Sequence, residues 1–257
     1  MPERIISKAN ARVRALRAAL LSRRGDTIGL EGFHLLREAI RSGLTLDTVF
    51  VRDDKAHLLD TLGAGAMREV VLLSAEAFDS AAATEHAQGV AALLQRPASP
   101  YSPRTGDLLL VADALQDPGN LGTLIRSAES FGAAAVALTA NTVDPWNGKC
   151  LRAAAGAAFR LPMPRWDDAL LAGLRALGAR TFAAVPRQGT FAHDADLSGT
   201  VALIIGNEGA GVSPAMLEIA GEQITLATSG PTESLNAAVA GSLLLYEASQ
   251  QRMRGRA

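Results

Sequence analysis

Cysteine and aromatic residues are scarce in this sequence of 257 residues. Cys150 is its one cysteine, so no disulfide can form within the chain and no cysteine-rich metal site can be built. This lack of disulfides favours a reducing cytoplasm. Phe, Trp and Tyr make up 4% of the residues, which argues against a protein that binds single-stranded nucleic acid by stacking bases on aromatic rings.

Long apolar runs and a strong net charge are also missing. No apolar run reaches about 18 residues and the N-terminus has no signal-peptide core, so we expect neither a membrane span nor secretion. The formal net charge is −1, with 48% hydrophobic and 20% charged residues, an ordinary composition for a globular protein. The length fits one large domain or two small ones.

Positive charge is concentrated in the first 24 residues, where the basic side chains are opposed only by Glu3. Such a cluster suits contacts with the phosphates of a nucleic acid, and a solvated helix face is the alternative interpretation. We take Lys8, Arg12, Arg23 and Arg24 as the candidate RNA contacts.

Prolines divide the chain near residue 100. Residues 96–106 read RPASPYSPRTG, and three prolines in this stretch exclude a helix or a central strand. We therefore predict a first domain over residues 1–96, a linker over residues 97–106 and a second domain over residues 107–257.

Apolar patterns predict alternating strands and helices on both sides of the linker, which is typical of the α/β class. In the first domain, strands are expected at residues 27–31, 46–51, 70–73 and 89–94, and helices at residues 7–22, at 33–42 and from 74. In the second domain, fully apolar runs predict buried parallel strands at residues 108–112, 135–138, 181–184 and 201–205. Two further helices are expected at residues 120–131 and 234–252.

The first of three motifs covers residues 117–126, which read DPGNLGTLIR directly after a predicted strand. Pro118 and Gly119 favour a turn, and Asn120 is a candidate N-cap for the helix that follows. Arg126 then lies about two turns into this helix. Taken alone, the segment is a strand–turn–helix joint with a surface arginine.

The second motif covers residues 203–211, which read LIIGNEGAG and place three glycines around Glu208 where an apolar strand ends. Glycines let the backbone approach a ligand closely. The loop lacks the Gly-Lys-Ser/Thr ending of a P-loop and the glycine spacing of a dinucleotide-binding fingerprint. Taken alone, it is equally well a plain turn.

The third motif begins with Ile224-Thr225-Leu226 and, after a polar loop, continues as ESLNAAVA over residues 233–240. Ser234 is a candidate cap for the last helix. Asn236 is expected to tie this loop to the second motif. The small residues that follow leave a narrow helix face, which admits close packing.

Together and in this order, the motifs Asn-x-Gly-x-x-x-Arg, Gly-Asn-Glu-Gly-x-Gly and Ser-Leu-Asn resemble those of the SpoU (TrmH) branch of the SPOUT methyltransferases. Residues 144–147 and 151–157 also resemble the intermediate region of that family. Residues 6–10 and 30–36 resemble the substrate-binding domain that is often attached to it. The resemblance therefore covers nearly the whole chain.

The resemblance implies an α/β SPOUT domain with a parallel sheet and a deep trefoil knot, a feature that is otherwise nearly absent from proteins. It implies a small L7Ae/L30e-like α/β RNA-binding domain before it, a homodimer, and S-adenosyl-L-methionine (SAM) as the cofactor, with no metal. By position, Gly206, Ile224 and Leu235 match residues that hold the cofactor, and the candidate cofactor site is completed by Asn207, Gly209, Gly211 and Leu226. The residues that match the polar catalytic set are Asn120, Arg126, Glu208, Ser234 and Asn236.

One departure concerns the third motif. Thr225 and Leu226 stand where the family commonly has Pro and Met. Because proline stiffens a loop, we expect its loss to loosen the pocket for the adenine of SAM.

The implied reaction is methyl transfer to a ribose 2′-oxygen of RNA, with 23S or other rRNA favoured over tRNA because a separate RNA-binding domain is present. The family view makes Arg126 a general base. An arginine side chain keeps its proton at ordinary pH, so we expect Arg126 to hold an RNA phosphate and to stabilise the oxyanion instead. Glu208 is expected to orient Arg126 or Asn120, and His193 is expected at the surface. A tRNA enzyme and a non-catalytic RNA-binding ribosome-assembly factor stay open as alternatives.

Overall fold

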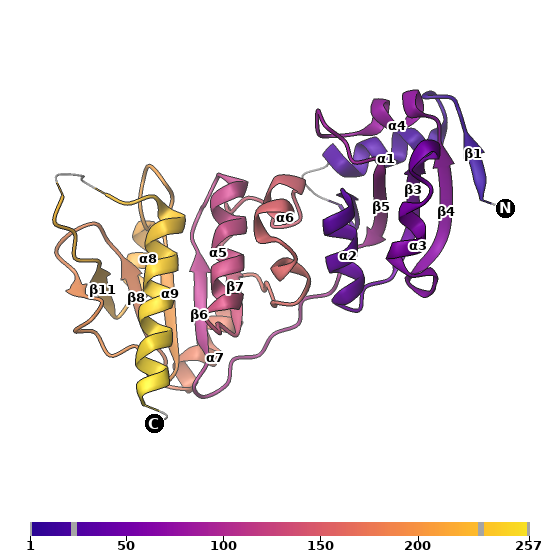
Figure 1. Ribbon diagram of the computed structural model, residues 1–257. Coiled ribbons are helices and arrows are strands. Elements are labelled where there is room, and N and C mark those ends of the chain that lie inside the picture. Colours follow the sequence, from indigo (N-terminus) through magenta and orange to yellow (C-terminus); the bar gives the residue numbers. More distant parts are fainter. Residues whose placement is uncertain (1, 22–24, 231–233, 256–257) are drawn as a thin grey trace. The chain divides into compact units, whose positions relative to one another are not determined.

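The structure is a computed structural model, which describes residues 2–21, 25–230 and 234–255 (Figure 1). Contacts between Cα atoms divide the chain into a first unit, Met1–Ala98 with Asp144–Arg160, and a second unit, Ser99–Val143 with Leu161–Ala257. The chain thus passes from the first unit to the second, returns to the first at residues 144–160, and then completes the second. Both units combine helices with a sheet, so the predicted α/β class is confirmed.

The first unit contains a mixed sheet of five strands in the order β1-β4-β3-β5-β2. These strands are β1 (Glu3–Ile5), β2 (Thr27–Glu31), β3 (Leu46–Arg52), β4 (Met67–Leu73) and β5 (Val90–Gln95). Strands β1, β4 and β3 are parallel, whereas β5 runs antiparallel to both β3 and β2. The four predicted strands are confirmed; β1, with three residues, is too short for an apolar pattern.

The helices of the first unit are α1 (Ala11–Leu21), α2 (Phe33–Arg41), α3 (Leu58–Leu62), α4 (Ala75–Ala81) and α6 (Gly148–Ala154), with short 3₁₀ turns at Asp53–Lys55, Ala64–Ala66 and Ala157–Phe159. Val13, Leu16 and Leu20 form the buried face of α1, as their spacing predicts. Helix α1 begins later than predicted, because the Asn10 side chain accepts the N–H of Arg12 at 2.8 Å and so replaces the preceding turn. The lone cysteine is buried in α6.

The second unit contains six parallel strands in the order β7-β6-β10-β8-β11-β9. These strands are β6 (Leu108–Ala112), β7 (Ala135–Leu138), β8 (Arg180–Ala184), β9 (Thr190–Phe191), β10 (Val201–Ile205) and β11 (Glu222–Thr225). Every residue of β6 and β10 is buried, which explains why both read as continuous apolar runs. The four predicted strands are confirmed here as well.

The helices of the second unit are α5 (Pro118–Ser130), α7 (Asp168–Ala176), α8 (Pro214–Ile219) and α9 (Ala237–Arg254). Helix α9 packs closely on α5, because a Cβ on Gly241 would lie only 2.4 Å from Leu124 Cδ2. The hydroxyls of Ser127 and Ser242 add a hydrogen bond of 2.7 Å between the two helices. Figure 1 shows α9, in yellow, running along the sheet of this unit. Strand order and register do not test the trefoil knot, which stays a prediction.

The three motifs follow the carboxyl ends of β6, β10 and β11, which all belong to one parallel sheet. In such a sheet the carboxyl ends share one edge, and ligands bind beyond that edge. Within the described ranges no helix is both long and apolar enough to cross a membrane.

Candidate functional site

Helix α5, which carries the first motif, begins at a cap supplied by Asp117. The Oδ1 atom of Asp117 accepts the N–H of Asn120 at 2.9 Å, and Pro118 takes the first helical position, where its fixed φ and missing N–H fit best. The prediction that Asn120 caps this helix is therefore wrong. Asn120 lies in the first turn, and its side chain contacts the other two motifs.

Gly206, where β10 meets the second motif, has no space for a side chain. A Cβ on Gly206 would lie 2.1 Å from the N atom of Val212 and 2.2 Å from the C atom of Gly211. The backbone therefore turns back on itself at contact distance, which only glycine permits. Gly209 differs, because its Cβ would have Asn207 Oδ1 as nearest neighbour at 3.7 Å.

Asn207 holds the glycine loop in one shape. Its Oδ1 accepts the N–H groups of Gly209 at 2.9 Å and Ala210 at 3.0 Å, and its Nδ2 donates to the carbonyl oxygen of Ala114 at 2.8 Å. Two backbone hydrogen bonds of 2.9 Å between Asn207 and Gly211 close the turn. The loop is thus fixed internally and also to the segment that follows β6.

Three polar side chains, one from each motif, form a continuous chain of hydrogen bonds. Asn236 Nδ2 donates to Asn120 Oδ1 at 3.1 Å, and Asn120 Nδ2 donates to Glu208 Oε1 at 3.0 Å. Glu208 also accepts the backbone N–H groups of Gln116 at 3.3 Å and Asp117 at 3.2 Å. We expected Asn236 to contact the second motif directly. In the structure Asn236 contacts Asn120, and Asn120 in turn contacts Glu208 of the second motif.

The carboxylate of Glu208 is stabilised in its charged form. Burial alone raises the pKa of Glu208, but hydrogen bonds from Asn120 and from the N–H groups of Gln116 and Asp117 outweigh it and lower the pKa below its ordinary value. Of the two partners expected for Glu208, the structure supplies Asn120. Because an ionised carboxylate only accepts hydrogen bonds, Glu208 fixes the orientation of the Asn120 amide.

Helix α9 begins immediately after Asn236, whose Oδ1 accepts the N–H groups of Ala238 at 2.9 Å and Val239 at 3.2 Å. The prediction that Ser234 caps this helix is wrong. Asn236 both caps α9 and donates to Asn120, and Ser234 lies outside the helix with an exposed side chain.

The second and third motifs enclose a cavity of about 350 Å³, which we call the motif cavity. Its walls come from the ends of β8, β10 and β11 and from α9. All the residues expected to hold the cofactor line it: Gly206, Asn207, Gly209, Gly211, Ile224, Leu226 and Leu235. Glu208 and Ser234 of the expected catalytic set line it too, and Asn120 and Asn236 connect to it through Glu208.

Thr225 stands where the family commonly has proline, and its side chain fixes this segment by a hydrogen bond. The side chain of Thr225 lies on the cavity wall and is buried, and its Oγ1 donates to the carbonyl oxygen of Pro186 at 3.1 Å. This bond ties the end of β11 to the segment after β8. We expected the absence of proline to loosen this wall. The hydrogen bond from Thr225 opposes that loosening, and proline could not make it because proline has no hydroxyl.

Arg126 lies about two turns into α5 with an exposed side chain. It does not line the motif cavity that the described residues enclose. An exposed guanidinium retains its charge and its planar set of donors, both of which suit a phosphate. His193 is also exposed, as expected, and its ring stacks on Phe191 at 5.5 Å between centroids.

The wall formed after β8 was not anticipated from the sequence. Ala184, Val185 and Pro186 line the cavity at the end of a strand that the apolar pattern does predict. The signal that identifies them is their position, since ligands bind beyond the carboxyl ends of parallel strands. Among the residues described, no group of three or more His, Cys, Asp or Glu side chains is arranged to hold a metal ion.

The expected RNA contacts of the first unit are only partly described. Arg23 and Arg24 lie outside the described residues. Lys8 is exposed, and its Nζ lies 3.4 Å from an Oε1 of Glu76, whose side chain is also exposed. A solvated pair of this kind contributes little stability, so Lys8 can exchange Glu76 for a phosphate at little cost.

Arg12 is held more firmly than Lys8. Its guanidinium binds Glu69 at one end and Glu3 at the other, the latter at 2.5 Å. The hydrogen bond that Arg12 donates to Glu69, followed by the one it donates to Glu3, raises the pKa of Arg12 although burial opposes it. A phosphate would therefore have to displace two carboxylates from Arg12.

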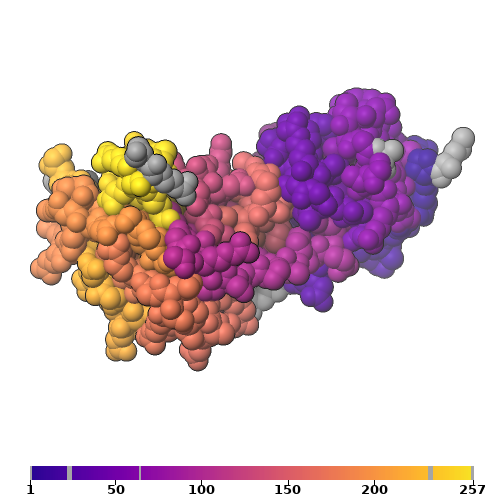
Figure 2. All heavy atoms as spheres, turned by 90° about the horizontal axis from the view of Figure 1, so that it is seen from below, coloured from indigo at the N-terminus to yellow at the C-terminus, as the bar shows by residue number. Residues whose placement is uncertain are grey.

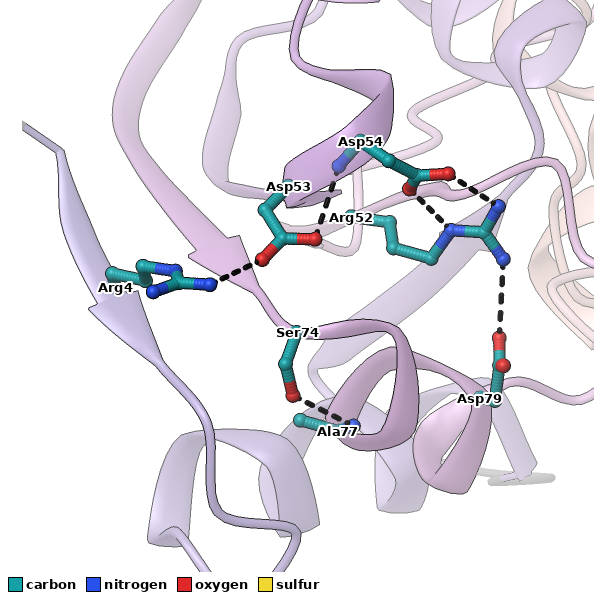
Figure 3. Close-up of polar contacts among 7 residues, drawn as sticks. All are labelled: Arg4, Arg52, Asp53, Asp54, Ser74, Ala77 and Asp79. Atoms are coloured by element: carbon teal, nitrogen blue, oxygen red, sulfur yellow. Dashed lines mark hydrogen bonds and ion pairs between the residues drawn. The ribbon is translucent and has the colours of Figure 1, made fainter.

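Two further arginines of the first unit are paired in the same way, as Figure 3 shows. Arg4 donates to Asp53 at 2.7 Å. Arg52 donates to both carboxylate oxygens of Asp54, at 2.6 and 2.9 Å, and lies 3.7 Å from Asp79. Much of the basic charge at this end of the unit is thus balanced by acids, either close in sequence, as Asp54 is to Arg52, or distant, as Asp53 is from Arg4.

Comparison with known families assigns both parts of the chain. The model of the SpoU rRNA Methylase family matches residues 107–246, more than half of the chain. The model described as RNA 2′-O ribose methyltransferase substrate binding matches residues 30–100.

Individual proteins are similar over most of the chain. The 23S rRNA (guanosine(2553)-2′-O)-methyltransferase RlmP of Bacillus subtilis is 36% identical over 222 residues, which are 86% of this chain and 88% of that protein. The AdoMet-bound rRNA methyltransferase from Sinorhizobium meliloti superimposes with a TM-score of 0.84 at 26% identity, over 96% of this chain and 97% of that one. A crystal structure of an RNA 2′-O ribose methyltransferase gives a TM-score of 0.81 at 29% identity, over 97% and 99% of the two chains.

Proposed function

The chain belongs to the SpoU rRNA methylase family, and we propose that it transfers the methyl group of SAM to a ribose 2′-oxygen of ribosomal RNA. The observation that carries this proposal is the hydrogen-bonded chain Asn236–Asn120–Glu208, which joins the three motifs beside one cavity. A non-catalytic RNA-binding factor needs neither this hydrogen-bonded chain nor Arg126. This sequence retains all four residues, Asn120, Arg126, Glu208 and Asn236.

The motif cavity fits SAM in size and in chemistry. A volume of about 350 Å³ falls in the range of small-molecule sites. Ile224, Leu226 and Leu235 offer an apolar wall for the adenine, and the Gly206 and Gly211 backbone offers polar groups at close approach. When bound, SAM supplies an electrophilic methyl group on a sulfonium.

Arg126 acts on the RNA at the reacting ribose. Its exposed guanidinium binds phosphate oxygens through a planar fork of donors and so places the ribose. The same positive charge stabilises the negative charge that develops on the 2′-oxygen. Because a guanidinium has no site for another proton, the hydroxyl proton passes to water or to a phosphate oxygen.

Asn120 is positioned by the other two motifs. Glu208 accepts from its Nδ2 and Asn236 donates to its Oδ1, so both ends of the amide are fixed before substrate arrives. Glu208 and Asn236 are therefore positioning residues, which set the start of α5 and with it the helix that carries Arg126.

Ribosomal RNA is the substrate that the relatives favour. RlmP is named for a guanosine of 23S rRNA, and this chain carries a region that matches a substrate-binding model beside its methylase region. We therefore propose 23S rRNA as the substrate and the cytoplasm as the compartment, with tRNA as the alternative substrate.

A second copy of the chain is the proposed partner of α9. Val239, Leu243 and Tyr246 follow one face of this helix, and each is between 44% and 48% exposed. Tyr246 packs edge-on against Phe131 at 5.7 Å between ring centroids, which extends this apolar face to the end of α5. Figure 2 shows the last turns of α9, in yellow, at the surface. Exposed apolar faces of this kind mark protein interfaces, and we expect Leu243→Glu to turn a dimer into a monomer in light scattering, whereas a monomeric wild type contradicts the dimer.

The experiment that tests the function supplies methyl-labelled SAM with unmodified transcripts of 23S rRNA, 16S rRNA and tRNA. We expect label in 23S rRNA with the wild type. Label in tRNA alone establishes the alternative substrate, and an absence of label in every transcript contradicts the proposal.

A further inference from the structure

The first unit contains a cavity of its own, of about 520 Å³, which we call the first-unit cavity. Its walls come from the end of β2 with the start of α2, from the loop at residues 84–88 and from the end of α6. The polar side chains on these walls are Glu31, His34, Thr84, Glu85, His86, Gln88 and Arg152. All of them belong to the first unit.

Two of these side chains build the wall. The buried carboxylate of Glu31 accepts the N–H of Ala83 at 2.9 Å and the hydroxyl of Thr84 at 2.5 Å. The Oε1 atom of Gln88 accepts the N–H of Phe33 at 2.8 Å and so satisfies a donor at the start of α2. Glu31 and Gln88 therefore hold the loop at residues 84–88 against β2 and α2.

Four other polar side chains on these walls are exposed, although they line a concave surface: His34, Glu85, His86 and Arg152. The Nδ1 atom of His34 lies 3.3 Å from a guanidinium nitrogen of Arg37, which in turn lies over the Phe33 ring at 5.8 Å from its centroid. The cavity thus presents two imidazole rings, the guanidinium of Arg152, the exposed carboxylate of Glu85 and the positive end of the nine-residue helix α2.

Arg152 reaches this cavity because the segment that carries it is anchored on α2. Helix α6 is followed by Ala155 and Gly156, both in the left-handed region with φ of 49° and 94°. A Cβ on Gly156 would lie 2.8 Å from the Cβ of Glu38, so the backbone there touches α2. Arg160 then donates to Glu38 at 3.2 Å.

The carboxylate of Glu38, which anchors this segment, is stabilised in its charged form by two arginines. Burial by itself raises the pKa of Glu38, but hydrogen bonds from Arg41 and Arg160 outweigh it and lower the pKa. Glu38 is therefore ionised at neutral pH and holds Arg160 as an ion pair. The position of Arg152 on the cavity wall follows from this contact and from the turn at Gly156.

We propose that the first-unit cavity binds one nucleotide of the RNA substrate. Arg152 and the start of α2 bind its phosphate, and the rings of His34 and His86 pack on its base, since proteins recognise unpaired RNA bases by such planar groups. A volume of about 520 Å³ is sufficient for one nucleotide. This inference rests on RNA as the substrate of the proposed function.

The cavity joins two parts of the sequence that the family models separate. His34 and His86 lie in the region matched as substrate binding, whereas Arg152 lies in the region matched as methylase. A nucleotide held here is therefore bound by both regions at once. Removal of these side chains is expected to weaken RNA binding without a change in SAM binding, because none of them lines the motif cavity.

The test measures the Kd of the full-length protein for a 23S rRNA transcript. Arg152→Ala is expected to weaken binding about 5- to 10-fold, and the combination with His34→Ala and His86→Ala at least about 30-fold. The Kd for SAM and kcat at saturating RNA are expected to stay at the wild-type values. Arg68→Ala is the matched control, since Arg68 is an exposed arginine of the same unit outside the cavity.

A second measurement locates the RNA directly. The wild type is irradiated with a 23S transcript that contains 4-thiouridine, and cross-linked peptides are identified by mass spectrometry. Cross-links in the peptides that carry His34 or His86 support the proposal. Cross-links confined to other peptides, or variants that bind within twofold of the wild type, overturn it.

The two proposals fail differently. A wild type that binds rRNA through this cavity but transfers no methyl group contradicts the proposed function alone. A wild type that methylates rRNA while the triple variant binds normally contradicts the first-unit cavity alone. A wild type that binds no rRNA contradicts both.

Discussion

The two cavities are built by opposite means. The motif cavity is formed by short side chains and backbone, with Gly206 at contact distance from the next turn and Asn207 hydrogen-bonded on three sides. The first-unit cavity is lined instead by long exposed side chains such as His86 and Arg152. A preformed wall suits one small molecule of fixed shape, whereas exposed polar side chains suit a polymer that presents varied surfaces.

The largest effect is expected from one methyl group added to the preformed wall. Gly206→Ala places a carbon 2.1 Å from a backbone nitrogen, so the glycine loop must open. We expect the Kd for SAM, measured by calorimetry, to rise at least about 100-fold, which corresponds to about 2.7 kcal/mol.

Gly209→Ala is the matched control for this substitution, since its added carbon has room within the same loop. We expect it to bind SAM within about threefold of the wild type. Equal losses in the two variants would show that the loop is not preformed and would remove the contrast between the cavities.

Arg126→Ala separates catalysis from the binding of the cofactor. Because Arg126 does not line the motif cavity, the Kd for SAM is expected to stay unchanged while kcat falls about 100- to 1,000-fold. Arg126→Lys keeps the charge but loses the planar fork and is expected to recover part of the rate. Full turnover by Arg126→Ala contradicts the assigned role.

Asn236 has two functions that substitution can separate. Asn236→Asp keeps the oxygen that caps α9 but loses the donor to Asn120, so we expect kcat to fall about 10-fold with little change in Tm. Asn236→Ala loses the cap as well, which costs about 1 kcal/mol and lowers Tm by about 2–4 °C. A normal kcat in the Asp variant would show that the contact with Asn120 is structural only.

The smallest effect concerns pH. The pKa of Glu208 is lower in the folded chain than in the unfolded one, so its stabilising contribution is complete above the unfolded pKa of about 4.3 and is lost as pH falls through the folded pKa. The difference in unfolding free energy between the wild type and Glu208→Gln is expected to be constant from pH 6 to 8 and to shrink below about pH 4. A difference that grows on acidification contradicts the hydrogen bonds assigned to this carboxylate.

The sequence predicts best where one physical requirement dominates. Strands β6 and β10 are buried on both faces, so their apolar runs define them to the residue. Helix starts were predicted less well, because several polar residues compete near each one. Asp117 rather than Asn120 caps α5, because Pro118 takes the first helical position. Asn236 rather than Ser234 caps α9, and its contact with Asn120 fixes it there.

Contacts between segments that are distant in the sequence could not be predicted from local sequence patterns. The order of the strands and the pairing of Arg12 with Glu69 depend on tertiary contacts. The same holds for the first-unit cavity, where Arg152 joins residues more than 60 positions away. The motif cavity was accessible from the sequence because the resemblance to a family supplied the tertiary relation among three loops.

The most direct test of the central claim identifies the atom that receives the methyl group. A 23S rRNA transcript methylated by the wild type with labelled SAM is hydrolysed in alkali, which cleaves every linkage that has a free 2′-hydroxyl. The account predicts label in an alkali-resistant dinucleotide with the wild type, formed at least about 100-fold more slowly with Arg126→Ala. Label recovered as a methylated base, or an unmodified transcript, would contradict it.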